Sequence, residues 1–242
     1  MNKVMLLALV PLAACSMASG SDNGGGVPAS GGGTARSYAI NGFTAVKLTG
    51  SDNVVVRVGQ GFSVNATGPS DILDRLKIEK DGDTLKIGRR SHSGFSWGSS
   101  KSATITVTMP ALNAAAVTGS GDMSVDRVKA NELKLAATGS GDLAVETIEV
   151  QNGSFSITGS GSIRAGGTAQ ALDLSVTGSG DIDAQRLTAR SASVSVMGSG
   201  SANATVDGEA TVSIMGSGDV DLGPKAHCKT SKMGSGDVRC GN

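Results

Sequence analysis

The tripeptide Gly-Ser-Gly occurs seven times in the second half of this 242-residue chain, and its spacing constrains the fold more than any other feature. The copies are 18 to 20 residues apart, and their first glycines are Gly119, Gly139, Gly159, Gly178, Gly198, Gly216 and Gly234. A repeat of this length indicates a protein built from stacked structural units. It has to be interpreted before any single motif.

Apolar residues recur at fixed distances from each tripeptide. Four residues after the first glycine the chain has Met123, Leu143, Ile163, Ile182, Ala202, Val220 and Val238. Two residues before it stand Val117, Ala137, Ile157, Val176, Val196, Ile214 and Lys232. Polar residues alternate with them, as in strands that bury one face. Because one unit buries too few aliphatic side chains to offset the entropy of ordering it, the units must stack, which predicts an all-β solenoid.

The repeat continues towards the N-terminus in a less regular form. Two segments, Thr49-Gly50-Ser51 and Thr67-Gly68-Pro69, resemble the later Gly-Ser-Gly segments, which we call glycine corners. We therefore expect less regular coils from about residue 38 onward. Between Gly68 and Gly119 we expect one helical turn in "SDILDRL", a turn at Asp81-Gly82, and a loop in "RRSHSGFSWGSSKS".

The first fifteen residues, "MNKVMLLALVPLAAC", have the pattern of a secretory signal. The apolar run is too short to span a bilayer. Its end, Leu12-Ala13-Ala14-Cys15, resembles the lipobox of bacterial lipoproteins, which implies cleavage after residue 14 and lipidation of Cys15. Ser16 at the next position implies sorting to the outer membrane. The alternative is an ordinary cleavage site that contains a cysteine.

The predicted organisation has three parts. Residues 1–14 form the signal peptide, residues 15–36 form a flexible tether rich in glycine and serine, and residues 37–242 form the solenoid. The order of "INGFTAVKLTGSDNVVVRVGQG", "LDRLKIEKDGDTLKIG", "VTMPAL" and the GSGD repeats resembles the family called putative auto-transporter adhesin, head GIN domain. This resemblance covers roughly residues 37 to 240 and implies a right-handed parallel β-helix. The family name implies adhesion, and the family supplies no catalytic residues to transfer.

Aspartates follow several of the glycine corners, and stacked coils would bring some of these carboxylates together. Asp122 and Asp142 would be neighbours, as would Asp219 and Asp237, and a calcium ion between them is one hypothesis. The alternative is that each carboxylate accepts hydrogen bonds from N–H groups of the turns. We favour the second interpretation and predict no metal and no cofactor.

One loop combines aromatic and basic residues, and we consider it the candidate binding site. Its members are Arg89, Arg90, His92, Phe95, Trp97 and Lys101. An exposed tryptophan beside arginine could stack on a sugar or enter a lipid headgroup layer. Alternatively, Phe95 and Trp97 cover an open flank of the solenoid.

Cys228 and Cys240 both fall at inward positions of the last unit. In an exported protein this placement favours a disulfide that closes the C-terminal end, with two buried free thiols as the alternative.

The composition narrows the function classes. Twenty-one basic residues balance twenty-one acidic ones, which argues against a nucleic-acid partner. Neither histidine, His92 nor His227, lies in a catalytic motif. The sequence predicts a non-enzymatic, lipid-anchored envelope protein that is adhesin-like or scaffolding, held to the membrane through Cys15, with an envelope glycan or surface protein as partner. The alternatives are an envelope polysaccharide-processing β-helix enzyme and a calcium-stabilised binding module.

Overall fold

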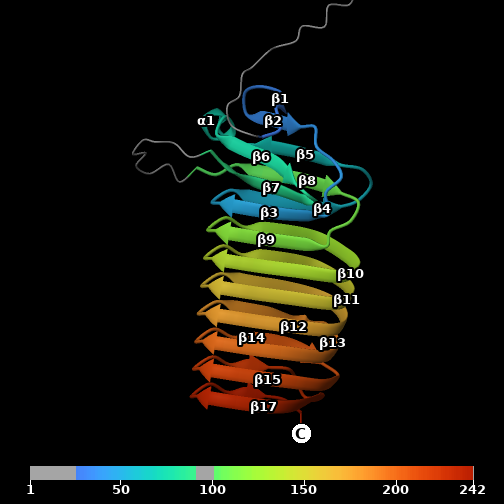
Figure 1. Ribbon diagram of the computed structural model, residues 1–242, viewed down its shortest axis with the longest axis vertical. Coiled ribbons are helices and arrows are strands. Elements are labelled where there is room, and N and C mark those ends of the chain that lie inside the picture. The colour runs from blue at the N-terminus through green and yellow to red at the C-terminus, as the bar shows by residue number, and fades with distance from the viewer. Residues whose placement is uncertain (1–25, 91–100, 242) are drawn as a thin grey trace, which may run out of the picture.

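The protein is a β-solenoid of about six turns, shown by a computed structural model that describes residues 26–90 and 101–241. Figure 1 shows the coils stacked along the long axis, with the N-terminal elements at one end and the C-terminus at the other. The coils pair in parallel, residue by residue, over most of their length. The predicted fold class is therefore confirmed.

Each central coil is one long strand that bends around the core. These strands are β10 (Met123–Gly139), β11 (Leu143–Gly159), β12 (Ser162–Gly178) and β13 (Asp181–Gly198). The last coils are divided into shorter strands: β14 (Ala202–Val206), β15 (Gly208–Gly216), β16 (Val220–Asp221), β17 (Ala226–Gly234) and β18 (Val238–Arg239). Each strand that leads into a glycine corner ends on the first glycine of that corner.

The glycine corners stack so closely that no side chain fits at either glycine. Gly139 has a φ of 111°, and a Cβ on it would overlap the carbonyl oxygen of Gly119 in the preceding coil. A Cβ on the second glycine, Gly141, would overlap the carbonyl oxygen of Gly121. The serine N–H between the two glycines donates to the first glycine's carbonyl in the preceding coil at 2.8–3.0 Å in all seven corners. The close backbone contact between coils therefore requires glycine at both positions, which explains the repeat.

Coils differ in length, and the difference is absorbed away from the glycine corner. The register shifts in three successive pairs of coils begin beside Val145, Arg164 and Ala184. The first glycines remain paired with each other from Gly50 and Gly119 to Gly216 and Gly234. The intervals vary from 18 to 20 residues because these shifts take up the difference in length while the first glycines stay paired.

Aliphatic columns fill the interior between the coils. One column consists of Leu135, Phe155, Leu174, Val194 and Val212, which are paired coil to coil and at most 2% exposed. Val128, Ile148 and Leu187 are also buried.

Antiparallel strands close the N-terminal end. β3 (Ala45–Gly50) and β4 (Asn53–Val58) form the first coil level and pair with β9 (Ala114–Gly119) and β10 on one side. On the other side they pair in parallel with β7 (Thr84–Arg89) and β8 (Thr104–Met109). β1 (Ala29–Ser30), β2 (Ala35–Tyr38), β5 (Ser63–Thr67) and β6 (Leu76–Asp81) add antiparallel pairs. The parallel core therefore has no open edge at this end.

Two sequence predictions fail in this region. Thr67-Gly68-Pro69 is not a solenoid corner, because β5 runs antiparallel to β8 and leads into a short helix, α1 (Ser70–Leu73). The predicted tether is also too long, because β1 and the start of β2 lie within residues 15–36, and the Val27 N–H donates to the Ile78 carbonyl at 2.7 Å. The folded part thus includes Val27 and the strands that follow it. The predicted helical turn and the Asp81-Gly82 hairpin turn are confirmed.

No helix in the described part of the chain is long and apolar enough to cross a membrane.

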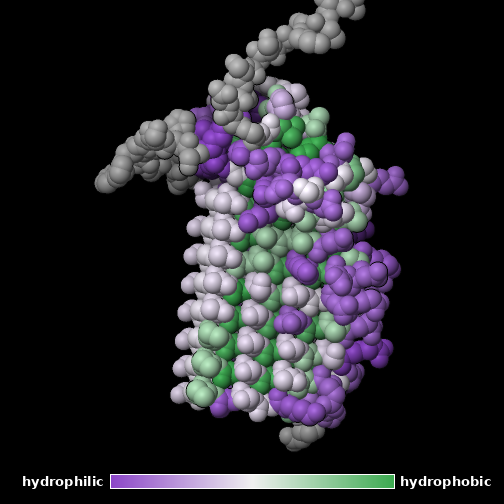
Figure 2. Space-filling model, viewed as in Figure 1, coloured by the Kyte–Doolittle hydropathy of each residue, from purple (hydrophilic) through white to green (hydrophobic). Residues whose placement is uncertain are grey.

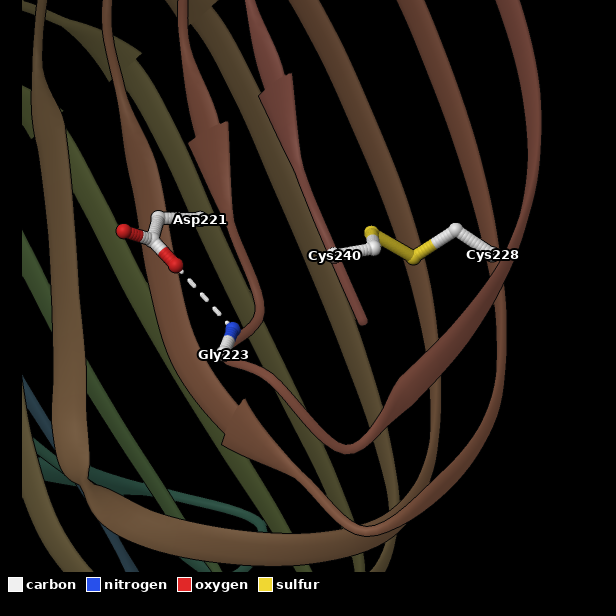
Figure 3. Close-up of a disulfide and its surroundings, with 4 residues drawn as sticks. All are labelled: Asp221, Gly223, Cys228 and Cys240. Atoms are coloured by element: carbon white, nitrogen blue, oxygen red, sulfur yellow. Dashed lines mark hydrogen bonds between the residues drawn. A yellow bond between two sulfur atoms is a disulfide. The ribbon is translucent and has the colours of Figure 1, made fainter. Parts of the chain in front are cut away.

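A disulfide closes the C-terminal end. Cys228 and Cys240 are joined, with their Cα atoms 6.2 Å apart, and Figure 3 shows the bridge between β17 and the segment after β18. In the same view the Gly223 N–H donates to the Asp221 carboxylate at 3.0 Å. Thr230 and Lys232 replace the aliphatic residues of the inward columns, and both are exposed on the last coil that the structure describes. The crosslink and these polar residues finish the solenoid.

We expect Gly139→Ala to lower the free energy of unfolding by about 3 kcal/mol or more, because both the backbone conformation and the contact with Gly119 forbid a Cβ. Gly223→Ala is the matched control, since Gly223 has a φ of 79° but open space around its Cβ position. It should lose only about 1 kcal/mol. Urea unfolding followed by circular dichroism measures both, and equal losses would contradict the steric explanation.

Candidate functional site

The predicted binding loop is only partly within the described residues. His92, Phe95 and Trp97 lie outside them. Arg90 directly follows β7, and its N–H donates to the Arg75 carbonyl at 2.9 Å, while Lys101 is exposed. The structure therefore places only the two ends of this loop.

Arg89 holds the loop ends to the core. Its guanidinium donates to both carboxylate oxygens of Asp52, at 2.8 and 2.6 Å, and to the Lys101 carbonyl at 3.1 Å. The Ala103 N–H also donates to the Asp52 carboxylate, at 2.8 Å. Arg89 therefore has a structural role at this end of the predicted binding loop, and the binding role of the loop stays a prediction. The hydrogen bond with Asp52 raises the pKa of Arg89 against the opposing effect of burial.

Asp52 occupies the place of the second corner glycine in the first coil. Its backbone lies against the Cβ position of Gly121, the second glycine of the following corner. The carboxylate is fully buried, at 0% exposure, and is the one buried charged side chain among the described residues. A side chain fits here because the next level contains β7 and β8 instead of another glycine corner, and these supply the cation and N–H that a buried carboxylate requires.

The corner aspartates form hydrogen bonds along the solenoid. The carboxylates of Asp122, Asp142, Asp181 and Asp219 accept the backbone N–H of the equivalent residue in the next coil at 2.8–3.0 Å. The Asn53 side chain accepts the Asp122 N–H in the same way, at 3.4 Å. The interpretation that these carboxylates satisfy turn N–H groups is confirmed. Among the described residues, no group of three or more His, Cys, Asp or Glu side chains could hold a metal ion.

Asp142 is the corner carboxylate with the most hydrogen bonds. Burial acts to raise its pKa, but the hydrogen bonds from the Ser162 hydroxyl and N–H and the nearby Arg164 outweigh burial, so the pKa of Asp142 lies below its usual value. Its hydrogen bonds therefore stabilise the fold above the ordinary aspartate pKa of about 4. This contribution is lost as the pH falls through the lower folded value.

A groove crosses four coils on the face formed by the second halves of the strands. It has a volume of about 530 Å³ and lies over β10 to β13. Its floor consists of Leu133, Gly153, Leu172 and Ala192, which are paired coil to coil. Figure 2 shows this face, where small pale side chains stand in columns with apolar surface between them.

Two outward columns form the walls of the groove. One consists of Lys134, Ser154, Asp173 and Ser193, and the other of Glu132, Asn152, Ala171 and Ser191. Hydroxyl, amide, ammonium and carboxylate groups thus flank a floor that runs along the solenoid axis, in which Leu133, Leu172 and Ala192 are at most 8% exposed. Four coils at about 4.8 Å spacing give the groove a length of roughly 14 Å between the outer strands. Such a shape suits an extended chain better than a compact molecule.

Comparison with known families and structures agrees with this architecture. The model of the family "Putative auto-transporter adhesin, head GIN domain" matches residues 42–226. The chain belongs to this family. No curated protein matches this head GIN domain.

Solved structures show that the fold of this head GIN domain has been seen before. A putative adhesin from Bacteroides fragilis has a TM-score of 0.79 at 22% identity, over 85% of this chain and 95% of that one. A putative lipid binding protein from Parabacteroides distasonis has a TM-score of 0.66 at 23% identity, over 85% and 95%. A putative adhesin from Parabacteroides merdae has a TM-score of 0.64 at 19% identity, over 86% and 95%. These similarities establish the fold.

Sequence reasoning did not find the groove of this head GIN domain. The repeat identifies inward and outward positions, and it places Lys134, Ser154, Asp173 and Ser193 on one outward column. The hollow depends on the second column, where the small residues Ala171 and Ser191 follow Glu132 and Asn152 in the next two coils. Small residues at the same outward position of successive coils are the sequence signal that could have indicated the groove.

We expect Asp52→Asn to lower the free energy of unfolding by about 3 kcal/mol, because it leaves the Arg89 guanidinium partly buried without its countercharge. Asp74→Asn is the control. Asp74 pairs with Arg36 at 2.7 Å but is 64% exposed, and its loss should cost less than about 1 kcal/mol. Urea denaturation gives both values, and an Asp52→Asn protein as stable as the unmodified one would show that the buried pair does not stabilise the fold.

Proposed function

We propose that this protein is a non-enzymatic, lipid-anchored binding protein of the bacterial cell envelope that holds a glycan chain in the groove over β10 to β13. The groove carries the proposal: it is open and elongated, with Leu133 and Leu172 in its floor and polar groups along both walls. Apolar ring faces and hydroxyl groups of a sugar chain match these two kinds of surface. The family name, which denotes adhesion, supports a binding role.

The positions of the carboxylates favour binding over the glycan-processing alternative. The two carboxylates of the groove, Glu132 and Asp173, stand in different walls and two coils apart. An enzyme of this type needs carboxylates that converge on the substrate. Asp122, Asp142, Asp181 and Asp219 instead accept backbone N–H groups at the corner of the solenoid. The calcium alternative is weakened by the same hydrogen bonds, because they engage one oxygen of each of these carboxylates.

The position of the chain's entry into the fold supports the proposed anchoring. The described chain begins at residue 26 beside the N-terminal elements, and Figure 1 shows the C-terminal coils at the opposite end. A lipid on Cys15, which lies outside the described residues, would therefore hold the N-terminal end near the membrane. The groove and the C-terminal coils would project away from it.

Ser154→Trp tests the groove. Ser154 points outward within the groove, so the indole should fill it without entering the core, and glycan affinity should fall about tenfold or more. Thr211→Trp is the matched control, because Thr211 stands in the same outward column, paired with Ser193, but outside the groove. A glycan array and cosedimentation with peptidoglycan sacculi measure binding. The proposal is wrong if the unmodified protein binds no glycan, or if both variants lose binding equally.

Cys15→Ser tests the anchor separately. We expect the protein to move from the membrane fraction to the soluble fraction, because several acyl chains are needed for stable attachment. Ser16→Ala, at the neighbouring position, should stay with membranes. Immunoblots of fractionated cells give the result, and a Cys15→Ser protein that remains fully in the membrane fraction would contradict lipid anchoring at this residue.

A further inference from the structure

One outward column of the solenoid changes from threonine to methionine in the last three coils. The residue before the first corner glycine is Thr118, Thr138, Thr158 and Thr177 in four successive coils, and then Met197, Met215 and Met233. Each pairs with the next in register. In Figure 2 the left edge of the lowest coils changes from pale to green at this position. The three methionines therefore stand one above another.

Packing does not explain this change. Met197, Met215 and Met233 are 52%, 53% and 70% exposed, and they are three of the four exposed large hydrophobic residues in the described part of the chain. Threonine occupies the same backbone position in earlier coils and suits an exposed strand. The methionine side chains thus offer their sulfur atoms to solvent where the fold does not need them.

The methionine column is accessible but narrow. It lies between two columns of exposed serines: Ser195, Ser213 and Ser231 on one side, and Ser199, Ser217 and Ser235 on the other. An apolar strip one side chain wide, between rows of hydroxyl groups, is poorly suited to docking an apolar surface. Small neighbours do, however, leave the thioethers free to approach a small ligand.

Stacked thioethers have the chemistry and spacing of a soft-metal site. Thioether sulfur favours Cu(I) over hard cations such as Mg²⁺ and Ca²⁺. Coils are about 4.8 Å apart, and a metal–sulfur bond is about 2.3 Å in zinc sites. Two neighbouring sulfurs that keep the spacing of their coils would therefore be at a separation that one ion can bridge. The three rotatable bonds of methionine let the third sulfur approach.

We propose that Met197, Met215 and Met233 form a binding site for a soft monovalent metal ion, Cu(I), near the C-terminal end of the solenoid. The ion lies over the middle coil and is held by neutral thioethers. The charged side chains beside these corners are Lys232, whose ammonium donates to the Gly236 carbonyl at 2.7 Å, and the corner residues Asp219 and Asp237. His227 lies at the opposite end of β17.

The test uses Ag(I) as an air-stable probe on the full-length chain carrying Cys15→Ser, so that the remaining cysteines are the disulfide pair. Methionine methyl groups labelled with ¹³C report binding by NMR. We expect the methyl signals of Met197, Met215 and Met233 to shift and saturate at one equivalent of Ag(I). Met109 and Met123, which are at most 1% exposed, are internal controls and should not move. Cu(I), added anaerobically, should displace Ag(I), and Zn²⁺ should not.

The threonines at the same position of earlier coils suggest a matched variant. Replacing all three methionines by threonine, the residue at the same position in earlier coils, should abolish the bound equivalent while the circular dichroism spectrum is unchanged. The reverse change, Thr138, Thr158 and Thr177 to Met, should create a second equivalent. Affinity should vary less than about twofold between pH 6 and 7.5, because thioethers bind no proton, whereas a histidine site would weaken at the lower pH.

Three results would overturn this proposal. The three methyl signals could stay unchanged when Ag(I) is added. The threonine variant could bind Ag(I) as tightly as the parent chain, which would place the ion on other groups. Affinity could fall several-fold towards pH 6, which would assign the ion to His92 or His227.

Discussion

The backbone contact between successive glycine corners is the constraint on which the rest of this solenoid depends. A serine N–H reaches the glycine carbonyl of the preceding coil because both flanking glycines lack a side chain. This contact fixes the register at one corner, and the fixed register aligns every inward aliphatic residue and every outward polar residue from coil to coil. Differences in coil length are then accommodated at the opposite part of the coil.

In this solenoid, the residues that stabilise the fold and the residues proposed to bind ligands occupy different positions of the coil. The glycine corners, the inward columns and the corner carboxylates are occupied by contacts between coils, so substitutions there affect stability. Outward columns are nearly free of such contacts, and a few changes in them create local chemistry: small residues produce the groove beside Ser154, and methionines produce a thioether column at Met215. Both proposed binding sites therefore lie on outward columns, whose residues differ from coil to coil. The rest of the repeat keeps the coils aligned.

Much of this architecture could be predicted, because equivalent positions have the same environment in every unit of the repeat. The sequence positions of Val125 and Ile157, or of Cys228 and Cys240, are enough to place them inside the coil, and the structure agrees. The N-terminal end could not be predicted, because Thr67-Gly68-Pro69 has the local sequence of a corner while its pairing with an antiparallel strand is a long-range property. The ion pair of Arg89 could not be predicted for the same reason, since its partner Asp52 is 37 residues away in the sequence.

Amide hydrogen exchange at the corner serines tests the central claim most directly. The Ser140 side chain is exposed, but its N–H donates to the Gly119 carbonyl at 2.9 Å in the preceding coil. If the stacked corners hold the solenoid together, this amide should exchange as slowly as that of the buried Ile157 in the same coil. Exchange of Ser140 at the rate of an unprotected peptide, while Ile157 stays protected, would show that the corners are open turns and that the aliphatic columns alone set the register.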